Sequence, residues 1–426
     1  MNIRVIAVSP IFLSFLLFTG LVLATTTTPS ETTASTAKKK RKKKSAAKPV
    51  AHTAKPVAMT AKVSSLSAAS SAHFVATAAT PSKTFKPSVR RRSSRGLWDE
   101  PTYADSTLGD NVDGEDLDVR RAAVEALGPL NGAVVVSDPA TGRILAMVNQ
   151  KLALSDGYQP CSTIKVPVAF AALSEGIIEP ETMRKIYGRT KINLTQALAK
   201  SNNQYFAGLG EELGYQKVSY YAHLFGLGEK AGLDIPGEHA GHFPSEPPKN
   251  GGMGMLTSFG EEISLTPLQL AAFMGSIANG GTLYYLQHPR SMEEVANFVP
   301  RVKRRLDIAT QIAQVEPGMR GAVQYGTARR INAITEDPIK GKTGTCSDRR
   351  THLGWFGSFD EVNGRKVVVA VLLTGGKPCI GPAAAGVAGN VYKNLASENF
   401  FTAKANPMTP AAFVSRAETS RPASGY

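Results

Sequence analysis

A serine stands three residues before a lysine at an expected helix start, in the segment Cys161-Ser162-Thr163-Ile164-Lys165. Three residues are nearly one helical turn, so the hydroxyl of Ser162 and the amine of Lys165 share a face. A serine hydroxyl is a weak nucleophile until a neighbouring base takes its proton. A lysine acts as that base only when it is neutral, which requires burial or a second cation nearby. Such a pair is common by chance, so the rest of the sequence must decide its meaning.

A second polar segment, Ser201-Asn202-Asn203, follows an amphipathic stretch. If it is an extended loop, Ser201 and Asn203 point the same way and both face a cleft. A hydroxyl at this position could relay a proton, and a carboxamide could hold a peptide amide. Taken alone, such a segment is more often a turn between helices.

A third segment, Lys342-Thr343-Gly344-Thr345, lies on a predicted strand. Alternation places its lysine and glycine on one face and its two threonines on the other. Gly344 has no Cβ, so the backbone of another chain could approach, and an extended peptide could add to the strand. The segment also resembles the end of a phosphate-binding loop, but Glu336 occupies the required glycine position, which excludes nucleotide binding.

The elements around these segments predict an α+β fold. Strands are expected before and after a mostly helical stretch at about 162–330, so both ends of the domain contribute to one antiparallel sheet of about five strands. The expected strands are 133–138, 143–149, 339–346, 353–359 and 366–374, with helices at 119–127 and about 383–397.

The charge of the chain is concentrated in an N-terminal tail. Residues 1–95 contain 17 Lys or Arg and one acidic residue, whereas the remainder contains 32 basic and 33 acidic residues. The net charge of +15 is therefore not a property of the folded part. We expect a disordered basic linker over 25–104, a folded domain over 105–405 and a disordered tail over 406–426. The linker is either a solvated tether or a contact to a membrane or an anionic wall polymer.

Residues 1–24 are mostly apolar behind Arg4. They fit a secretory signal peptide or an uncleaved membrane anchor equally well. The basic run at 38–44 opposes the positive-inside rule for an anchor. Both interpretations place the folded domain outside the cytoplasm.

Together, Ser162-x-x-Lys165, Ser201-x-Asn203 and Lys342-Thr343-Gly344 resemble the three motifs of the penicillin-recognising serine acyltransferases, in the same order. The resemblance extends over about 130–400 and is to penicillin-binding protein transpeptidases in particular. It implies a β-lactamase/transpeptidase-like fold with an inserted helical lobe. Further similar segments are Ala133 to Met147, Leu224 to Gly228, Asp234 to Glu238, Phe259 to Glu261, Thr266 to Ala271, Asn279 to Gly281, Gly326 to Ala328 and Trp355 to Gly357.

The resemblance implies a serine acyl-enzyme. Ser162 would attack the D-alanyl-D-alanine carbonyl of a peptidoglycan stem peptide, or a β-lactam ring. Lys165 would be the base, kept neutral partly by Lys342. Ser201 would pass a proton to the leaving group, and Asn203 would hold the substrate amide. No metal or organic cofactor is required.

The same resemblance implies how the substrate is held. Lys342, Thr343 and Thr345 would receive the terminal carboxylate. The backbone N–H groups of Ser162 and Thr345 would form the oxyanion hole, with Gly344 between the two threonines.

The resemblance also brings Cys161 and Cys346 next to the two oxyanion donors and so implies a disulfide between them. Some class A serine carbapenemases resemble this sequence at both positions. Of the three cysteines, Cys379 would then be free. A Cys346–Cys379 pair and three buried thiols are the alternatives. A Cα separation well beyond about 7 Å would exclude the implied pair.

The expected function is that of a penicillin-binding D,D-transpeptidase that cross-links stem peptides, with D,D-carboxypeptidase activity as a variant outcome. A serine β-lactamase is the alternative enzyme, although no Glu-x-x-Leu-Asn segment follows Asn203 and Asn203 differs from the class D pattern. A non-catalytic β-lactam sensor would need a cytoplasmic partner domain, which residues 1–4 do not supply. Nucleic-acid binding by the tail would require cytoplasmic retention.

Overall fold

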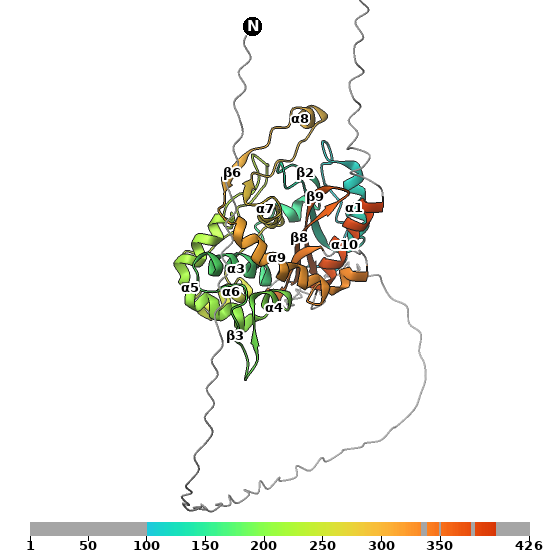
Figure 1. Ribbon diagram of the computed structural model, residues 1–426. Helices are drawn as coiled ribbons and strands as arrows, with labels where there is room; N and C mark the ends of the chain where they lie inside the picture. The colour runs from blue at the N-terminus through green and yellow to red at the C-terminus, as the bar shows by residue number, and fades with distance from the viewer. Residues whose placement is uncertain (1–99, 334–338, 349–350, 376–379, 398–426) are drawn as a thin grey trace, which may run out of the picture. The chain divides into compact units, whose positions relative to one another are not determined.

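A five-stranded antiparallel sheet forms the centre of the described chain (Figure 1). Its order is β2-β1-β9-β8-β7, so the first two strands and the last three strands of the domain meet at β1 and β9. The prediction of one sheet built from both ends of the domain is confirmed. The strands are β1 (Gly132–Ser137), β2 (Ile144–Val148), β7 (Lys340–Ser347), β8 (His352–Val362) and β9 (Arg365–Gly375).

The computed structural model describes residues 100–333, 339–348, 351–375 and 380–397. The predicted leader at 1–24 and the predicted tail at 406–426 lie outside these residues, as does the linker up to residue 99. None of the helices within the described ranges combines the length and the apolar character that a bilayer span requires.

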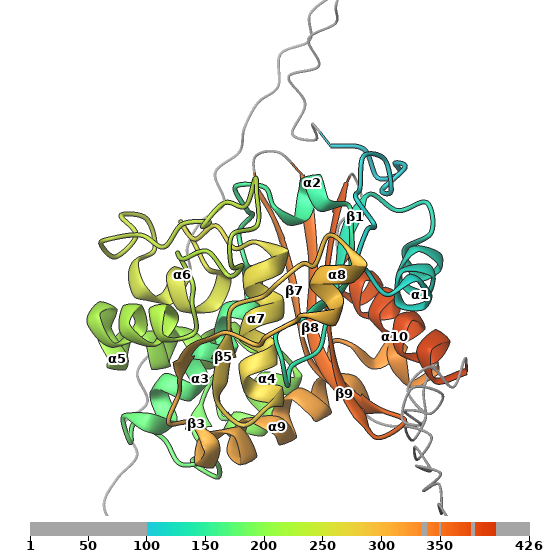
Figure 2. The ribbon, with the colours of Figure 1, turned by 90° about the horizontal axis from the view of Figure 1, so that it is seen from above.

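Helices cover both faces of the sheet, as Figure 2 shows. On one face lie α1 (Leu117–Leu127) and α10 (Gly381–Ser397), and on the other lies α7 (Pro267–Ala278) with the helical lobe. Alternate residues of β9 enter the two cores: Val369 and Val371 pack toward α1 and α10, whereas Ala370 packs toward the lobe. Burial on both faces explains why β9 is apolar from Val367 to Leu373 rather than alternating.

The helical lobe is inserted between β2 and β7, as predicted, but it is not purely helical. It contains two short hairpins, one of which projects downward in Figure 1 at β3. Strands of two to four residues are too short to show a period of two, which is why the sequence pattern missed them. The lobe comprises α2 (Gln150–Ala153), η1 (Cys161–Ile164), α3 (Lys165–Ser174), β3 (Arg184–Lys185), β4 (Lys191–Ile192), α4 (Leu194–Ala199), α5 (Asn203–Leu224), α6 (Gly252–Phe259), α7, β5 (Thr282–Tyr284), α8 (Met292–Ala296), β6 (Val302–Arg305), α9 (Ala309–Gln324) and η2 (Arg329–Ala333).

The packed part of the chain begins earlier than the predicted boundary at residue 105. Tyr158 donates its hydroxyl proton to Glu100 over 2.6 Å, and the N–H of Asn131 donates to the carbonyl of Thr102 over 2.9 Å. These bonds attach the entering segment to the turn before Ser162 and to the chain before β1. Composition did not indicate this, because individual hydrogen bonds rather than an apolar pattern hold the segment.

Candidate active site

The nucleophile segment is a short 3-10 turn, η1, followed at Lys165 by α3. Cys161 has a φ of 52°, a left-handed conformation that costs free energy for any residue other than glycine. Neighbouring groups hold this turn: Thr163 Oγ1 donates to the carbonyl of Pro160 over 2.8 Å, and Trp355 Nε1 donates to the carbonyl of Gln159 over 2.9 Å. The position of Ser162 is therefore fixed by β8 as well as by its own turn.

The amine of Lys165 is the centre of the site. Its Nζ lies 2.7 Å from Ser162 Oγ, 2.6 Å from Asn203 Oδ1 and 3.3 Å from Ser201 Oγ. One nitrogen thus contacts the side chains of both the first and the second sequence motif. This is the contact that proton transfer from the serine requires.

Burial sets the protonation of this amine. Lys165 has no exposed surface, and its Nζ lies 6.0 Å from the ring centre of Phe206 and 5.8 Å from that of Phe259. Removal from water disfavours the ammonium form, so burial lowers the pKa of Lys165 to about 7. Burial is the cause for Lys165, and the repulsion between Lys165 and Lys342, which we expected to contribute, lowers the pKa of Lys342.

Lys342 is equally buried and reaches the same hydroxyl from the opposite wall. Its Nζ donates to Ser201 Oγ over 2.8 Å and to the carbonyl of Thr343 over 2.9 Å. Burial lowers the pKa of Lys342 well below its usual range, and the charge of Lys165 lowers it further. Ser201 Oγ accepts from both lysines, so its own proton is left to donate into the cleft.

The second motif is a tight turn rather than the extended loop that we expected. Ser201 has a φ of 54° and ends α4, and Asn202 caps α5 by accepting from the N–H of Tyr205 over 2.8 Å. Asn203 is the first residue of α5. The two side chains converge on Lys165 because the chain reverses at Ser201, not because alternate residues of a strand share a face.

Gly344 has a packing role within the chain that is separate from the peptide pairing predicted for its strand. A Cβ on this residue would lie 2.8 Å from the carbonyl oxygen of Pro160 and 3.2 Å from Thr163 Cγ2. The backbone that an added Cβ on Gly344 would meet is therefore that of the nucleophile turn of the same chain. The glycine allows β7 to pack directly on η1, which brings Lys342 and Ser162 to one cleft.

A turn that follows α9 closes the third side of the site. The N–H of Thr327 donates to the carbonyl of Ala199 over 3.2 Å, and a Cβ on Gly326 would lie 2.0 Å from that oxygen. The hydroxyl oxygens of Thr327 and Thr343 are 2.5 Å apart. The turn thus joins the end of α4, next to Ser201, to β7.

A disulfide links the nucleophile turn to β7. Cys161 and Cys346 are bonded, with their Cα atoms 5.6 Å apart. This separation lies within the ordinary range for disulfides. Cys379, the partner in the alternative pairing, lies outside the described residues.

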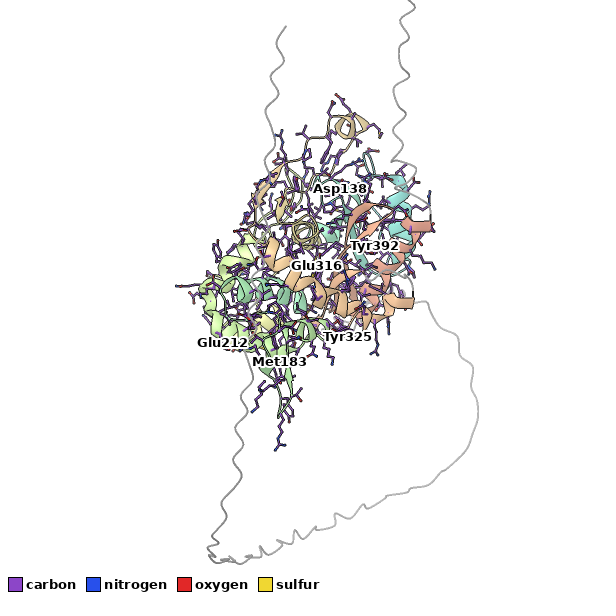
Figure 3. All side chains as sticks on the ribbon, in the orientation of Figure 1. Asp138, Met183, Glu212, Glu316, Tyr325 and Tyr392 are labelled. Atoms are coloured by element: carbon purple, nitrogen blue, oxygen red, sulfur yellow. A yellow bond between two sulfur atoms is a disulfide. The ribbon has the colours of Figure 1, made fainter. Side chains whose placement is uncertain are left out.

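These elements enclose a cleft of about 730 Å³. Five of the sequence-predicted residues line it, and the buried amines of Lys165 and Lys342 lie behind that lining. Tyr325, labelled in Figure 3, stands at the mouth with 47% of its surface exposed. The cleft lining is Ser162, Lys200, Ser201, Asn203, Phe259, Tyr325, Gly326, Thr327, Arg329, Arg330, Thr343, Thr345 and Pro382.

Most of the newly found lining residues come from the turn at 325–330. In the sequence, only the resemblance of Gly326 to Ala328 to a family segment pointed to this turn. That resemblance supported the fold and did not predict that the turn lines the cleft. The two arginines that follow, Arg329 and Arg330, had no sequence signal at all. Their place depends on how α9 packs against α4.

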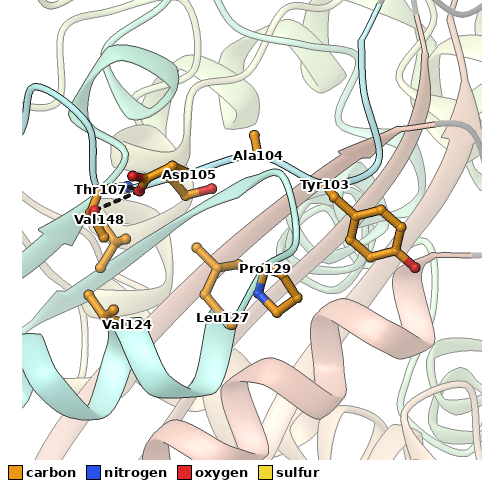
Figure 4. Close-up of a pocket in the computed structure, with 10 residues that line it drawn as sticks. Tyr103, Ala104, Asp105, Thr107, Val124, Leu127, Pro129 and Val148 are labelled. Carbon is orange, nitrogen blue, oxygen red and sulfur yellow. Dashed lines mark hydrogen bonds between the residues drawn. The ribbon is translucent and has the colours of Figure 1, made fainter.

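A second hollow, of about 570 Å³, lies between the entering segment and the end of α1 (Figure 4). Leu127 and Val124 line it together with Tyr103, and Thr107 bonds to Asp105 at its edge over 2.7 Å. It shares no lining residue with the cleft and holds none of the three motifs. This hollow is therefore separate from the candidate site that the motifs form.

The fold and the arrangement of the cleft agree with the penicillin-recognising class that the sequence motifs resemble. Residues 132–397 match the family described as penicillin binding protein transpeptidase domain, and the chain belongs to this family.

Among curated proteins, the chain is 29% identical over 317 residues to stage V sporulation protein D of Bacillus subtilis, covering 64% of this chain and 48% of that protein. It is 29% identical over 312 residues to peptidoglycan D,D-transpeptidase PbpA of Mycobacterium tuberculosis, covering 58% of this chain and 63% of that protein. The chain thus spans about half the length of the curated relatives that it matches.

Among solved structures, it resembles Pseudomonas aeruginosa PBP2 in complex with WCK 5153, with a TM-score of 0.55 and 25% identity over 66% of this chain and 74% of that chain. A peptidoglycan glycosyltransferase from Burkholderia ambifaria has a TM-score of 0.55 at 20% identity, covering 68% of this chain and 97% of that chain, which indicates the shared fold.

Proposed function

We propose that the protein is a penicillin-binding D,D-transpeptidase that acts on peptidoglycan stem peptides through an acyl-enzyme on Ser162. The observation that carries this proposal is the position of one amine: Lys165 Nζ lies 2.7 Å from Ser162 Oγ and 3.3 Å from Ser201 Oγ. A neutral lysine in this place accepts the serine proton as the oxygen attacks the D-alanyl carbonyl.

The proton then leaves by way of the second serine. Ser201 Oγ accepts from Lys342, so its hydrogen is oriented toward the leaving amine, and Lys165 replaces the proton that Ser201 gives up. The bond between the acyl carbon and the D-alanine nitrogen breaks, and the acyl group remains on Ser162. The backbone N–H groups of Ser162 and Thr345 stabilise the oxyanion, and Asn203 holds the peptide amide.

The terminal carboxylate of the substrate, or that of a β-lactam, is received by Lys342, Thr343 and Thr345. The contact between Thr327 and Thr343 supports this role, because it orients the Thr343 hydroxyl at the cleft. A peptide laid along β7, the edge strand of the sheet, would add main-chain hydrogen bonds.

The enzyme is proposed to work outside the cytoplasm. Residues 1–24 would export or anchor it, and the basic tether predicted over 25–104 would end near residue 99. The transpeptidase domain would extend from about residue 100 to 405, followed by a disordered tail at 406–426. The tether would also contact a membrane or an anionic wall polymer. The enzymatic chemistry needs neither a metal nor an organic cofactor.

Labelling with a fluorescent penicillin tests the proposal. We expect one covalent adduct, mapped to the peptide that contains Ser162, and loss of at least 99% of labelling in Ser162→Ala and Lys165→Ala, about the loss expected for a nucleophile and its base. Both variants should retain the melting temperature of the wild type within a few degrees. Labelling that persists in Ser162→Ala would reject the mechanism.

Hydrolysis of nitrocefin separates the proposed function from that of a β-lactamase. Within the described lining of the cleft there is no carboxylate that could activate water against the acyl-enzyme. We therefore expect a stable adduct and slow turnover. Steady hydrolysis at many turnovers per second would make the protein a β-lactamase instead.

A further inference from the structure

The mouth of the cleft carries three cations. Lys200, Arg329 and Arg330 line it and are exposed, and the described lining residues include no acidic side chain to balance them. Within the described ranges neither arginine forms an ion pair. Charges of one sign in a concave site raise the local concentration of oppositely charged ligands. The three exposed cations therefore make the cleft attractive to anionic ligands, in addition to any effect of the two buried lysines.

The two arginines stand on a particular side of the cleft. They follow the turn whose Thr327 contacts Thr343, and Thr343 belongs to the proposed carboxylate site. This is the side on which the leaving D-alanine lies before acylation. Once D-alanine has left, the same space is open to the amine that replaces it.

Deacylation by an amine reverses the geometry of acylation. The acceptor nitrogen forms a bond to the acyl carbon, the bond from that carbon to Ser162 Oγ breaks, and a proton from the nitrogen returns to the serine oxygen by way of Lys165. An acceptor that resembles D-alanine, with amine and carboxylate on one carbon, reproduces the interactions of the leaving group. An amine on a bare methylene, such as a lysine side chain, does not.

We propose, on the basis of the proposed function, that Arg329 and Arg330 select an acceptor whose reacting amine lies on a carboxylate-bearing carbon, as at one end of a diamino dicarboxylic acid. They are specificity-determining residues of the acceptor site. Their charge adds to that of Lys342 at the acceptor carboxylate, and it acts after the acyl-enzyme has formed.

Partitioning of the acyl-enzyme tests this proposal. The full-length protein is acylated with an N-acyl-D-alanyl thioester whose leaving thiol carries no carboxylate, and D-alanine or D-alaninamide is added as acceptor. Chromatography gives the ratio of aminolysis to hydrolysis for each amine. The two amines differ in intrinsic reactivity, but this difference is the same for the variant and the wild type. It therefore cancels when the preference for D-alanine over D-alaninamide is compared between the two proteins.

We expect the preference for D-alanine over D-alaninamide to fall about threefold in Arg329→Gln and in Arg330→Gln, and about tenfold in the double variant, as for exposed charges acting together. The conservative Arg329→Lys/Arg330→Lys variant should keep most of the preference. Arg305→Gln removes an exposed arginine of β6 outside the cleft lining and should change nothing. In the wild type, the preference should also decrease with added salt, because exposed charges are screened.

An unchanged preference in the double glutamine variant would overturn the proposal, as would a wild-type preference that is insensitive to salt. Failure of the proposed function has a different signature, since the wild type would then form no covalent adduct with fluorescent penicillin. A normal adduct with no acceptor discrimination rejects only the role of the arginines.

Discussion

At the scale of single residues, the site depends on two amines that are forced close to neutrality. Lys165 and Lys342 are both fully buried, and both reach Ser201 Oγ, at 3.3 and 2.8 Å. Two ammonium groups at such distances repel each other, so the site favours a state in which they share fewer than two charges. That state leaves one amine able to accept a proton and one able to attract a carboxylate.

The pH dependence of acylation follows from Lys165. Because burial lowers its pKa to about 7, the fraction of the neutral base rises as the pH rises through 7. We expect the rate of penicillin acylation to increase roughly tenfold per pH unit well below 7 and to level off above about 8. Stopped-flow measurement of the acylation rate between pH 5.5 and 8.5 provides the check. A flat profile, or an inflection near the ordinary lysine value, would exclude Lys165 as the base.

At the scale of elements, glycines determine how closely the site-bearing segments approach. Gly344 lets β7 contact the nucleophile turn, and Gly326 lets the turn after α9 contact the end of α4. Each of these contacts joins segments that are far apart in sequence. The groups that we propose to be catalytic are thus positioned by backbone packing as well as by side-chain hydrogen bonds.

Gly344→Ala tests this positioning. Its Cβ would lie 2.8 Å from the carbonyl of Pro160, so β7 and η1 must separate. Displacements of about 1 Å at reacting groups cost about 100-fold in rate, and we expect a loss of this order in penicillin acylation. Overpacking of about 1–3 kcal/mol should also lower the melting temperature by several degrees.

The matched control is Gly386→Ala in α10, where an added Cβ meets no atom within 4 Å. It should keep the acylation rate and slightly raise stability, because alanine favours a helix interior. An acylation rate in Gly344→Ala equal to that of this control would show that the contact between β7 and η1 is not needed.

At the scale of the whole molecule, the sequence predicted those features that depend on residue chemistry or on a periodic apolar pattern. The three motifs could be found because proton transfer and carboxylate binding demand particular residue types, and the centre of the sheet because β1, β2 and β9 are mostly apolar. The reversal at Ser201 is a turn between helices, which the sequence analysis offered as the commoner interpretation of this segment, but the lining by Arg329 could not be found in this way. The position of Arg329 depends on the packing of α9 against α4, which brings together residues more than 100 positions apart and leaves no local pattern.

The disulfide acts on this same scale, since it closes a loop over a sequence separation of 185. Closing so long a loop in the unfolded chain corresponds to about 5 kcal/mol of stabilisation in the chain-entropy description, and measured values are typically about 2–4 kcal/mol. We expect Cys161→Ala/Cys346→Ala to melt about 10 °C below the oxidised wild type. Reduction of the wild type with dithiothreitol should give a similar decrease, with no further effect on the double variant.

Cys379→Ala is the matched control, because it removes the third cysteine of the chain and leaves the Cys161–Cys346 pair intact. Its melting temperature should equal that of the wild type, and dithiothreitol should lower it by the same amount. Since Cys161 adjoins Ser162 and holds a left-handed conformation, loss of the bond should also slow penicillin acylation at temperatures well below melting. If the double variant instead matched Cys379→Ala in melting and in acylation, the link between η1 and β7 would contribute neither to stability nor to the geometry of the site.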